Sequence, residues 1–198
     1  MAVVSLGRHC QAAHQIDRLI GPGRPAQFFD WLITPHGGLI ALLEGGFSGF
    51  LTPANLRVDA EHLGHHVVVD TAFGVELFHE FPVGETVAGR LSAVQAKYAA
   101  LARRFLALPG PGCLFVRQVE PRDMRADHAQ AIMDALGRHF ASGFRLLMVS
   151  EALPEPGWEV AGVKMTQVAQ DEPYRWQGCD AAWDAVFGTL EYPHLRSG

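Results

Sequence analysis

The sequence predicts an α/β fold, a three-layer sandwich whose mainly parallel sheet is covered by helices on both faces. Two observations carry this prediction. Short apolar runs, which are typical of strands buried on both faces, alternate with amphipathic helical patterns along much of the chain. In addition, two alternating segments around Asp70–Gly74 predict an inserted β-hairpin. The 198 residues suit a single domain, residues 1–198.

The first predicted elements are a strand and a helix near the N-terminus. The strand is the apolar run Ala2–Leu6, which Gly7 closes. The apolar positions of the following helix lie on one side of it: Ala12, Ala13, Ile16, Leu19 and Ile20. Gly21–Gly23 ends that helix. A second helix is expected to begin at Thr34, with the threonine as N-cap and Pro35 in the first turn.

The hairpin is predicted over His66–Phe81. Its strands are Val67–Val69 and Val75–Phe81, on either side of the turn. By period-2 alternation, one face of the second strand is expected to hold Val75, Leu77, His79 and Phe81.

The longest helix follows the hairpin, because apolar residues recur at spacings of four and three from Val87 to Leu108. The remaining predicted strands are 113–116, 146–149 and 163–168, and the remaining helices are 123–140 and 180–190. This strand–helix alternation is what predicts a mainly parallel sheet.

Composition excludes several classes of protein. The net charge is −5 and the basic residues are scattered, so no stripe of them would follow a nucleic acid backbone. No apolar run approaches the ~20 residues of a membrane span, and the N-terminus lacks a signal-peptide pattern, so a cytoplasmic protein without a membrane partner is expected. The three cysteines form no C-x-x-C pair and predict no disulfide framework.

No cofactor or metal is expected. Neither a G-x-G-x-x-G nor a G-K-[ST] loop occurs, which disfavours dinucleotide and P-loop sites. The histidines at 62, 65 and 66 lack a further carboxylate or cysteine that would complete a zinc site, so a solvated turn is the preferred interpretation.

Cys10 is the leading candidate for the functional site. Ligands of open parallel sheets bind beyond the carboxyl ends of the strands, and the first such turn is Gly7-Arg8-His9-Cys10. Gly7 permits the sharp turn, and the free N–H groups of the next helix would favour a thiolate or form an oxyanion hole. The alternative is a packed cysteine without reactivity. Cys113 and Cys179 are interpreted as structural.

The chain resembles a bacterial family labelled papain-like cysteine peptidase. The resemblance rests on four blocks in order: Ser5–Cys10 (S-L-G-R-H-C), Phe29–Trp31 (F-D-W), Phe78–Pro82 (F-H-E-F-P), and Lys97-Tyr98 followed by Arg103–Phe105. It extends from Val4 to about Arg117. Glu80 stands where the family pattern has aspartate, and Phe28 stands where it has proline before F-D-W.

The resemblance implies Cys10 as nucleophile, His79 as its base and Asp30 as a candidate orienting group. An imidazole within hydrogen-bond reach would accept the thiol proton, and a carboxylate would fix its tautomer. Each residue keeps an alternative: His79 as a core histidine, and Asp30 as a cap for backbone N–H groups. The label also implies a papain-like α+β layout as the alternative fold.

Further candidates would bind substrate. Gly7 and Trp31 belong to the blocks just described, and His9 either lines the pocket or faces solvent. Arg117, at the end of a predicted strand, would bind a carboxylate or phosphate unless it is merely exposed.

The predicted function is a cysteine-dependent hydrolase or acyl transferase acting on a peptide or a small-molecule substrate. The first alternative is a non-catalytic module that binds a small ligand or an anion. A relative of the SGNH esterases, with cysteine in place of serine, is the minor alternative. The oligomeric state is left open.

Overall fold

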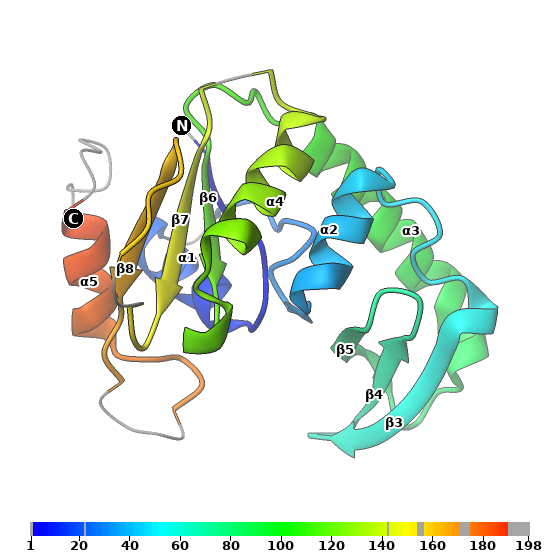
Figure 1. Ribbon diagram of the computed structural model, residues 1–198. Helices are drawn as coiled ribbons and strands as arrows, with labels where there is room; N and C mark the ends of the chain where they lie inside the picture. Colours follow the sequence, from blue (N-terminus) through cyan, green and yellow to red (C-terminus); the bar gives the residue numbers. More distant parts are fainter. Residues whose placement is uncertain (1, 22, 142, 154–156, 171–174, 190–198) are drawn as a thin grey trace.

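The computed structural model describes residues 2–21, 23–141, 143–153, 157–170 and 175–189 (Figure 1). Its first sheet is parallel throughout, with strand order β1-β6-β7-β8. The strands are β1 (Val3–Ser5), β6 (Leu114–Gln118), β7 (Arg145–Ser150) and β8 (Val163–Gln167). All four strands agree with the predicted apolar runs, the N-terminal one included, to within a few residues.

Helices cover both faces of the parallel sheet. On one face α1 (Gln11–Ile20) and α5 (Asp180–Gly188) pack on a core that includes Val116, Leu147 and Trp183. On the other face lie α2 (His36–Glu44), α3 (Val87–Leu106) and α4 (Ala126–Gly137) (Figure 1), and the larger core there includes Phe105 and Phe115. The chain therefore has the predicted α/β fold.

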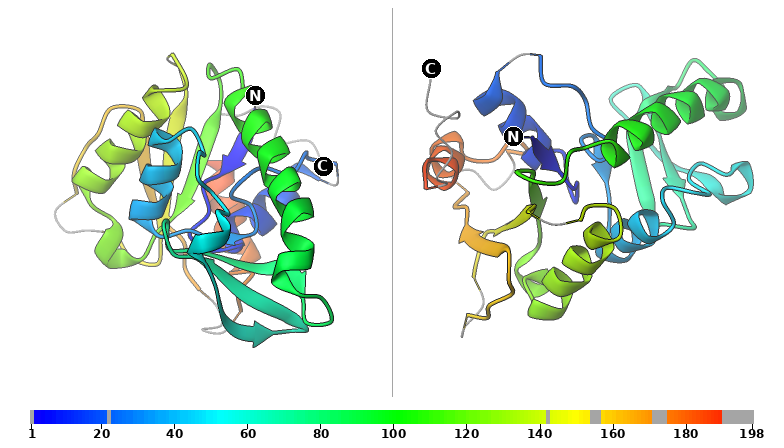
Figure 2. Two further views of the ribbon diagram at one scale, coloured as in Figure 1. Left: turned by 90° about the vertical axis from the view of Figure 1, so that its right-hand side faces the viewer. Right: turned by 90° about the horizontal axis from the view of Figure 1, so that it is seen from above.

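The predicted hairpin is half of a second, antiparallel sheet. Its strand order is β2-β5-β4-β3, and its strands are β2 (Leu32–Ile33), β3 (Leu56–His62), β4 (His65–Asp70) and β5 (Val75–Pro82). α3 packs against β5 and follows this sheet (Figure 2). The sequence did not predict β3, because all of its residues after Leu56 are exposed and so no alternation marks it.

A bulge in β5 overturns part of the predicted register. His66 pairs with Phe81 and Val68 pairs with Leu77, so three residues of β5 lie opposite Val67 alone. Val75, Leu77 and Phe81 are buried as predicted, but His79 is exposed and its neighbour Glu80 is buried. The expectation that His79 shares the buried face is therefore wrong, because the extra residues break the two-residue alternation.

Helix boundaries differ from the predicted ones at α2 and at both ends of α4, which stops at Gly137 and not at residue 140. Pro35, not Thr34, is the N-cap of α2, and the Thr34 hydroxyl makes no capping bond. The residues before Ala126 form a short 3₁₀ turn, Pro121–Asp123, so α4 starts later than expected. The predicted end of the last helix at residue 190 lies outside the described residues. Within the part of the chain that is described, no helix has the length and apolar character needed to cross a membrane.

Gly38 sets the distance between α2 and the antiparallel sheet. A Cβ at this buried position would lie 2.1 Å from the Phe73 carbonyl oxygen, in the β4–β5 turn. We expect Gly38→Ala to lower the free energy of unfolding by about 2 kcal/mol, because the backbone must shift to relieve this overlap. At exposed Gly37 a Cβ would meet none of the described atoms within 4 Å, so Gly37→Ala should stabilise the protein by about 0.5–1 kcal/mol. Urea unfolding of both variants tests the pair, and equal midpoints would contradict the expectation.

Candidate functional site

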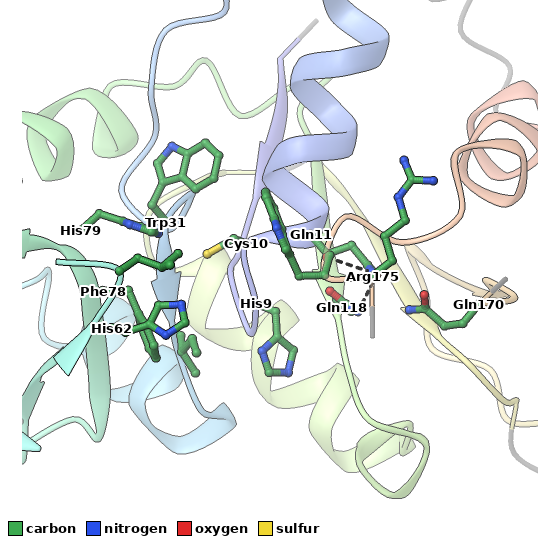
Figure 3. Close-up of a pocket in the computed structure, with 13 residues that line it drawn as sticks. His9, Cys10, Gln11, Trp31, His62, Phe78, His79, Gln118, Gln170 and Arg175 are labelled. Carbon is green, nitrogen blue, oxygen red and sulfur yellow. Dashed lines mark hydrogen bonds between the residues drawn. The ribbon is translucent and has the colours of Figure 1, made fainter. Parts of the chain in front are cut away.

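A cavity opens at the point where the helices leave the parallel sheet in opposite directions. β1 leads to α1 on one face and β6 leads to α4 on the other, so the carboxyl ends of these neighbouring strands leave a crevice between them. The cavity beside it has a volume of about 670 Å³. Cys10, at the start of α1, and Gln118, at the end of β6, line it on one side, and His62, Phe78 and His79 face them from the antiparallel sheet (Figure 3).

The turn before Cys10 has an unusual backbone. Gly7 and Arg8 are both in the left-handed region, with φ of 73° and 77°. Gly7 permits this conformation and a close approach, since a Cβ there would lie 3.1 Å from the Thr34 hydroxyl oxygen. Arg8 has no such freedom, but its guanidinium is held by Glu120, just after β6. The close approach of Gly7 to Thr34 and the bond between Arg8 and Glu120 thus hold this turn in place. Cys10 follows the turn as the N-cap residue of α1.

The Cys10 side chain is half-buried, and its sulfur points across the cavity towards Trp31 and Phe78 (Figure 3). Burial raises the pKa of this thiol to about 11, and the nearby Asp30 carboxylate also raises it. The thiol is therefore neutral at pH 7. The sequence-based expectation that the helix start favours a thiolate is not met, because the loss of solvation outweighs the helix N-terminus.

Among the described residues, three imidazoles line the cavity: His9, His62 and His79. The His79 ring meets the Trp31 ring edge to face at 6.2 Å between centroids, whereas the His9 ring points away from the Cys10 sulfur (Figure 3). Burial lowers the pKa of His79, and His65 lowers it further. Among the described residues no hydrogen bond joins the Cys10 sulfur to the His79 ring, so the two groups share the cavity as a neutral thiol and a neutral base.

Glu80 ties the β5 bulge to α3. Its buried carboxylate accepts hydrogen bonds from the Lys97 ammonium at 2.5 Å and from the Tyr98 hydroxyl at 3.1 Å. Because Glu80 is the residue next to His79, these bonds hold the backbone that presents the imidazole to the cavity.

With this geometry known, comparison with known proteins adds one finding. A family model described as Putative papain-like cysteine peptidase (DUF1796) matches residues 1–150. The chain belongs to this family. The match to DUF1796 includes β1, the antiparallel sheet, Cys10 and His79, and it ends with β7. No curated protein and no solved structure matches the chain.

Asp30 lies within the DUF1796 match but does not orient His79. Its carboxylate is buried, and one oxygen accepts bonds from the Arg24 guanidinium at 2.8 Å and from the Gln27 N–H at 2.7 Å. The other oxygen has no hydrogen-bond partner in the described part of the chain. Burial raises the pKa of Asp30, while Arg24 opposes that rise. The orienting contact suggested by the resemblance is thus not formed, because the carboxylate is engaged by its own turn.

Arg117 does not face the cavity. It is fully buried, and its guanidinium donates to the Leu6 carbonyl at 2.6 Å and to the Thr34 carbonyl at 2.7 Å. The expectation that it binds substrate is therefore wrong. Neighbouring residues of a strand point to opposite faces, so Gln118, the next residue, reaches the cavity instead. That ligands bind beyond the carboxyl ends of parallel strands indicated the end of β6, but it did not indicate which side chain there would face the cavity.

Gly7 likewise lies beneath the cavity and not on its wall, where its N–H donates to the Ser5 hydroxyl oxygen. His9 and Trp31, by contrast, do line the cavity, as their sequence positions suggested. The structure brings these two residues together with Cys10 and His79, but it separates Gly7 and Arg117 from them.

Sequence reasoning missed a further wall of the cavity. Gln170, Arg175 and Trp176 line it from the segment between β8 and α5, beyond the end of the DUF1796 match. Gln118 donates to the Gln11 side-chain oxygen at 2.7 Å, and Gln11 in turn donates to the Trp176 carbonyl at 3.2 Å, which fastens this segment to the sheet. No local pattern marks these residues, because they meet the site only through tertiary contacts.

The described residues include no group of three or more His, Cys, Asp or Glu side chains placed to hold a metal ion. What the cavity does present is a nucleophilic atom, a neutral base and the start of a helix. Throughout the described residues no side chain caps the first turn of α1.

Proposed function

We propose that this protein is a cysteine-dependent hydrolase or acyl transferase in which Cys10 attacks a carbonyl carbon and His79 accepts the thiol proton. The observation that carries the proposal is that Cys10 and His79 line one cavity, Cys10 from the start of α1 and His79 from β5. The family label requires a cysteine, and the matched residues contain Cys10 and Cys113. Cys113 is buried and does not line this cavity, which supports Cys10.

The neutral state of both groups favours general-base catalysis over a resting ion pair. When a substrate carbonyl lies against the sulfur, the S–C bond forms as the proton moves from sulfur to the free ring nitrogen of His79. The imidazolium then gives that proton to the leaving group. Water hydrolyses the resulting thioester, or another nucleophile takes the acyl group. The N–H groups at the start of α1 would stabilise the oxyanion.

Activity assays on Cys10 and His79 variants test the proposal, with a panel of activated esters, thioesters and amides as substrates. Cys10→Ala should abolish turnover, and His79→Asn should lower kcat/KM by about 10²–10⁴-fold. His66→Ala is the matched control, because it removes an imidazole of the same antiparallel sheet that does not line the cavity, and it should leave the rate near wild type. Since burial lowers the pKa of His79, kcat/KM should rise with pH through a midpoint below 6.5 as the base loses its proton.

Mass spectrometry of the quenched reaction should find the acyl group on the Cys10 peptide. Turnover that survives Cys10→Ala, or an acyl adduct elsewhere, would overturn the proposal.

One observation favours a second candidate, a non-catalytic binding module. The resting thiol is neutral and has no hydrogen bond to His79 within the described residues. Such a module would show ligand-induced thermal stabilisation that persists in Cys10→Ala, with no turnover of any substrate.

A further inference from the structure

The cavity has an aromatic wall that the proposed chemistry does not use. Trp31 and Trp176, here called the indole wall, meet edge to face with ring centroids 6.5 Å apart. The row continues on both sides, to His14 at 5.1 Å from Trp176 and to His79 at 6.2 Å from Trp31. Figure 3 shows Trp31 on the same side of Cys10 as the sulfur. A ring placed beside this row would find further edge-to-face partners.

Both indoles leave much of their apolar surface uncovered. Trp176 is 52% exposed and Trp31 is 36% exposed, and Leu63 adds a side chain that is 82% exposed. All three line the cavity, together with Phe78. Large apolar groups gathered around a concavity are typical of a ligand site, since a ligand removes their surface from water.

The charges around the cavity select against cations. No aspartate or glutamate is found among its lining residues in the described ranges, and Arg175 is its one arginine or lysine there. Arg175 lies 3.3 Å from Asp180, which partly balances its charge. A cationic group in the cavity would therefore lose solvation without meeting a carboxylate.

The cavity also has the size of a small-molecule site. Its volume of about 670 Å³ is within the range of about 300–1,000 Å³ that is typical of such sites. Trp176 lies outside the DUF1796 match and Trp31 lies inside it, so one of the two indoles is supplied by a part of the chain that the family model does not include.

We infer that the cavity takes an uncharged small substrate whose acyl group ends in an aromatic ring, with the ring against the indole wall and the carbonyl at Cys10. This inference rests on the proposed function, because it names the substrate class for that site. It assigns Trp176 as a residue that determines specificity.

Binding to the Cys10→Ser variant tests the ligand class separately from turnover. The probes are 4-phenylbutanamide, octanamide and 4-phenylbutylamine, and isothermal titration calorimetry measures their Kd. The aryl amide should bind tightest, and the amine should bind at least about tenfold more weakly because it carries a positive charge.

Substitutions at the indole wall give the second readout. In the Cys10→Ser background, Trp176→Ala should weaken binding of 4-phenylbutanamide by about tenfold, and Trp176→Phe should recover part of the loss because it keeps a ring. Leu106→Ala is the matched control, since Leu106 is an exposed apolar side chain that does not line the cavity. It should leave Kd unchanged. Circular dichroism checks that each variant is folded.

Three results would overturn the inference: no binding of the aryl amide, equal binding of octanamide or of the amine, or no effect of Trp176→Ala. Failure of the proposed function looks different. In that case the aryl amide binds with the expected dependence on Trp176, but the wild-type protein turns over no aryl-alkyl ester or thioester. Conversely, turnover that depends on Cys10 but not on Trp176 would leave the proposed function intact and exclude this substrate class.

Discussion

Arg117→Ala is expected to lower the free energy of unfolding by about 4 kcal/mol. The substitution removes a fully buried side chain and leaves the Leu6 and Thr34 carbonyls without the donors that now lie 2.6 and 2.7 Å away. Each buried acceptor left unpaired costs about 1–3 kcal/mol, and the space left by the side chain adds a further loss of packing.

The position of Arg117 explains why this loss should reach the site. Leu6 precedes the Gly7 turn after β1, and Thr34 follows β2, so one guanidinium joins the parallel sheet to the antiparallel one. We expect Arg117→Ala to reduce any activity that depends on Cys10 even under conditions where the protein is folded.

Urea unfolding followed by circular dichroism measures the stability effect. Arg122→Met is the control, because the Arg122 side chain is exposed and pairs only with Glu120 among the described residues, so its loss should change stability by less than about 0.5 kcal/mol. Arg117→Met separates the two contributions, since it restores volume but not the hydrogen bonds. A loss below about 1 kcal/mol for Arg117→Ala would contradict the role given to this residue.

Alkylation of Cys10 is expected to be about a hundredfold slower at pH 7 than alkylation of an ordinary exposed thiol. The thiolate is the reacting species, and raising the pKa from the ordinary value of 9.0 to about 11 lowers its population at neutral pH by that factor. The rate should then rise about tenfold for each pH unit between 7 and 10, without a plateau.

Iodoacetamide labelling with peptide mapping follows this reaction at Cys10, with N-acetylcysteine amide as the reference thiol. Because no hydrogen bond joins the two side chains in the described structure, His79→Ala should leave the profile unchanged. A plateau of fast labelling at pH 5–7 that His79→Ala abolishes would instead show a resting thiolate–imidazolium pair, and the general-base scheme would have to be abandoned.

Much of the architecture could be predicted from local patterns. The four parallel strands, the β4–β5 hairpin and the long helix α3 all follow from apolar periodicity, because an element that buries one or both faces must repeat at its own period. β3 had no such signal, since it lies on an edge with its side chains in solvent. The bulge in β5 was also hidden, because inserted residues leave the composition of a strand unchanged.

The candidate site, too, could be predicted only in part from local sequence. The glycine turn and the position of Cys10 at the start of α1 are local features, and the chain order of β1 and α1 was enough to predict them. Local sequence could not show which of two adjacent side chains faces the cavity. Arg117 is buried between the sheets, and Gln118 lines the cavity.

By itself, the sequence determined the α/β class, the sharp turn before Cys10 and the family to which residues 1–150 belong. Only the tertiary structure decided that Cys10 and His79 share a cavity, that Trp176 lines it with them, and that burial raises the pKa of the thiol. The physical reason is that periodicity reports how each segment meets water. Proximity between distant segments and the solvation of a single sulfur atom depend on how all of them pack together.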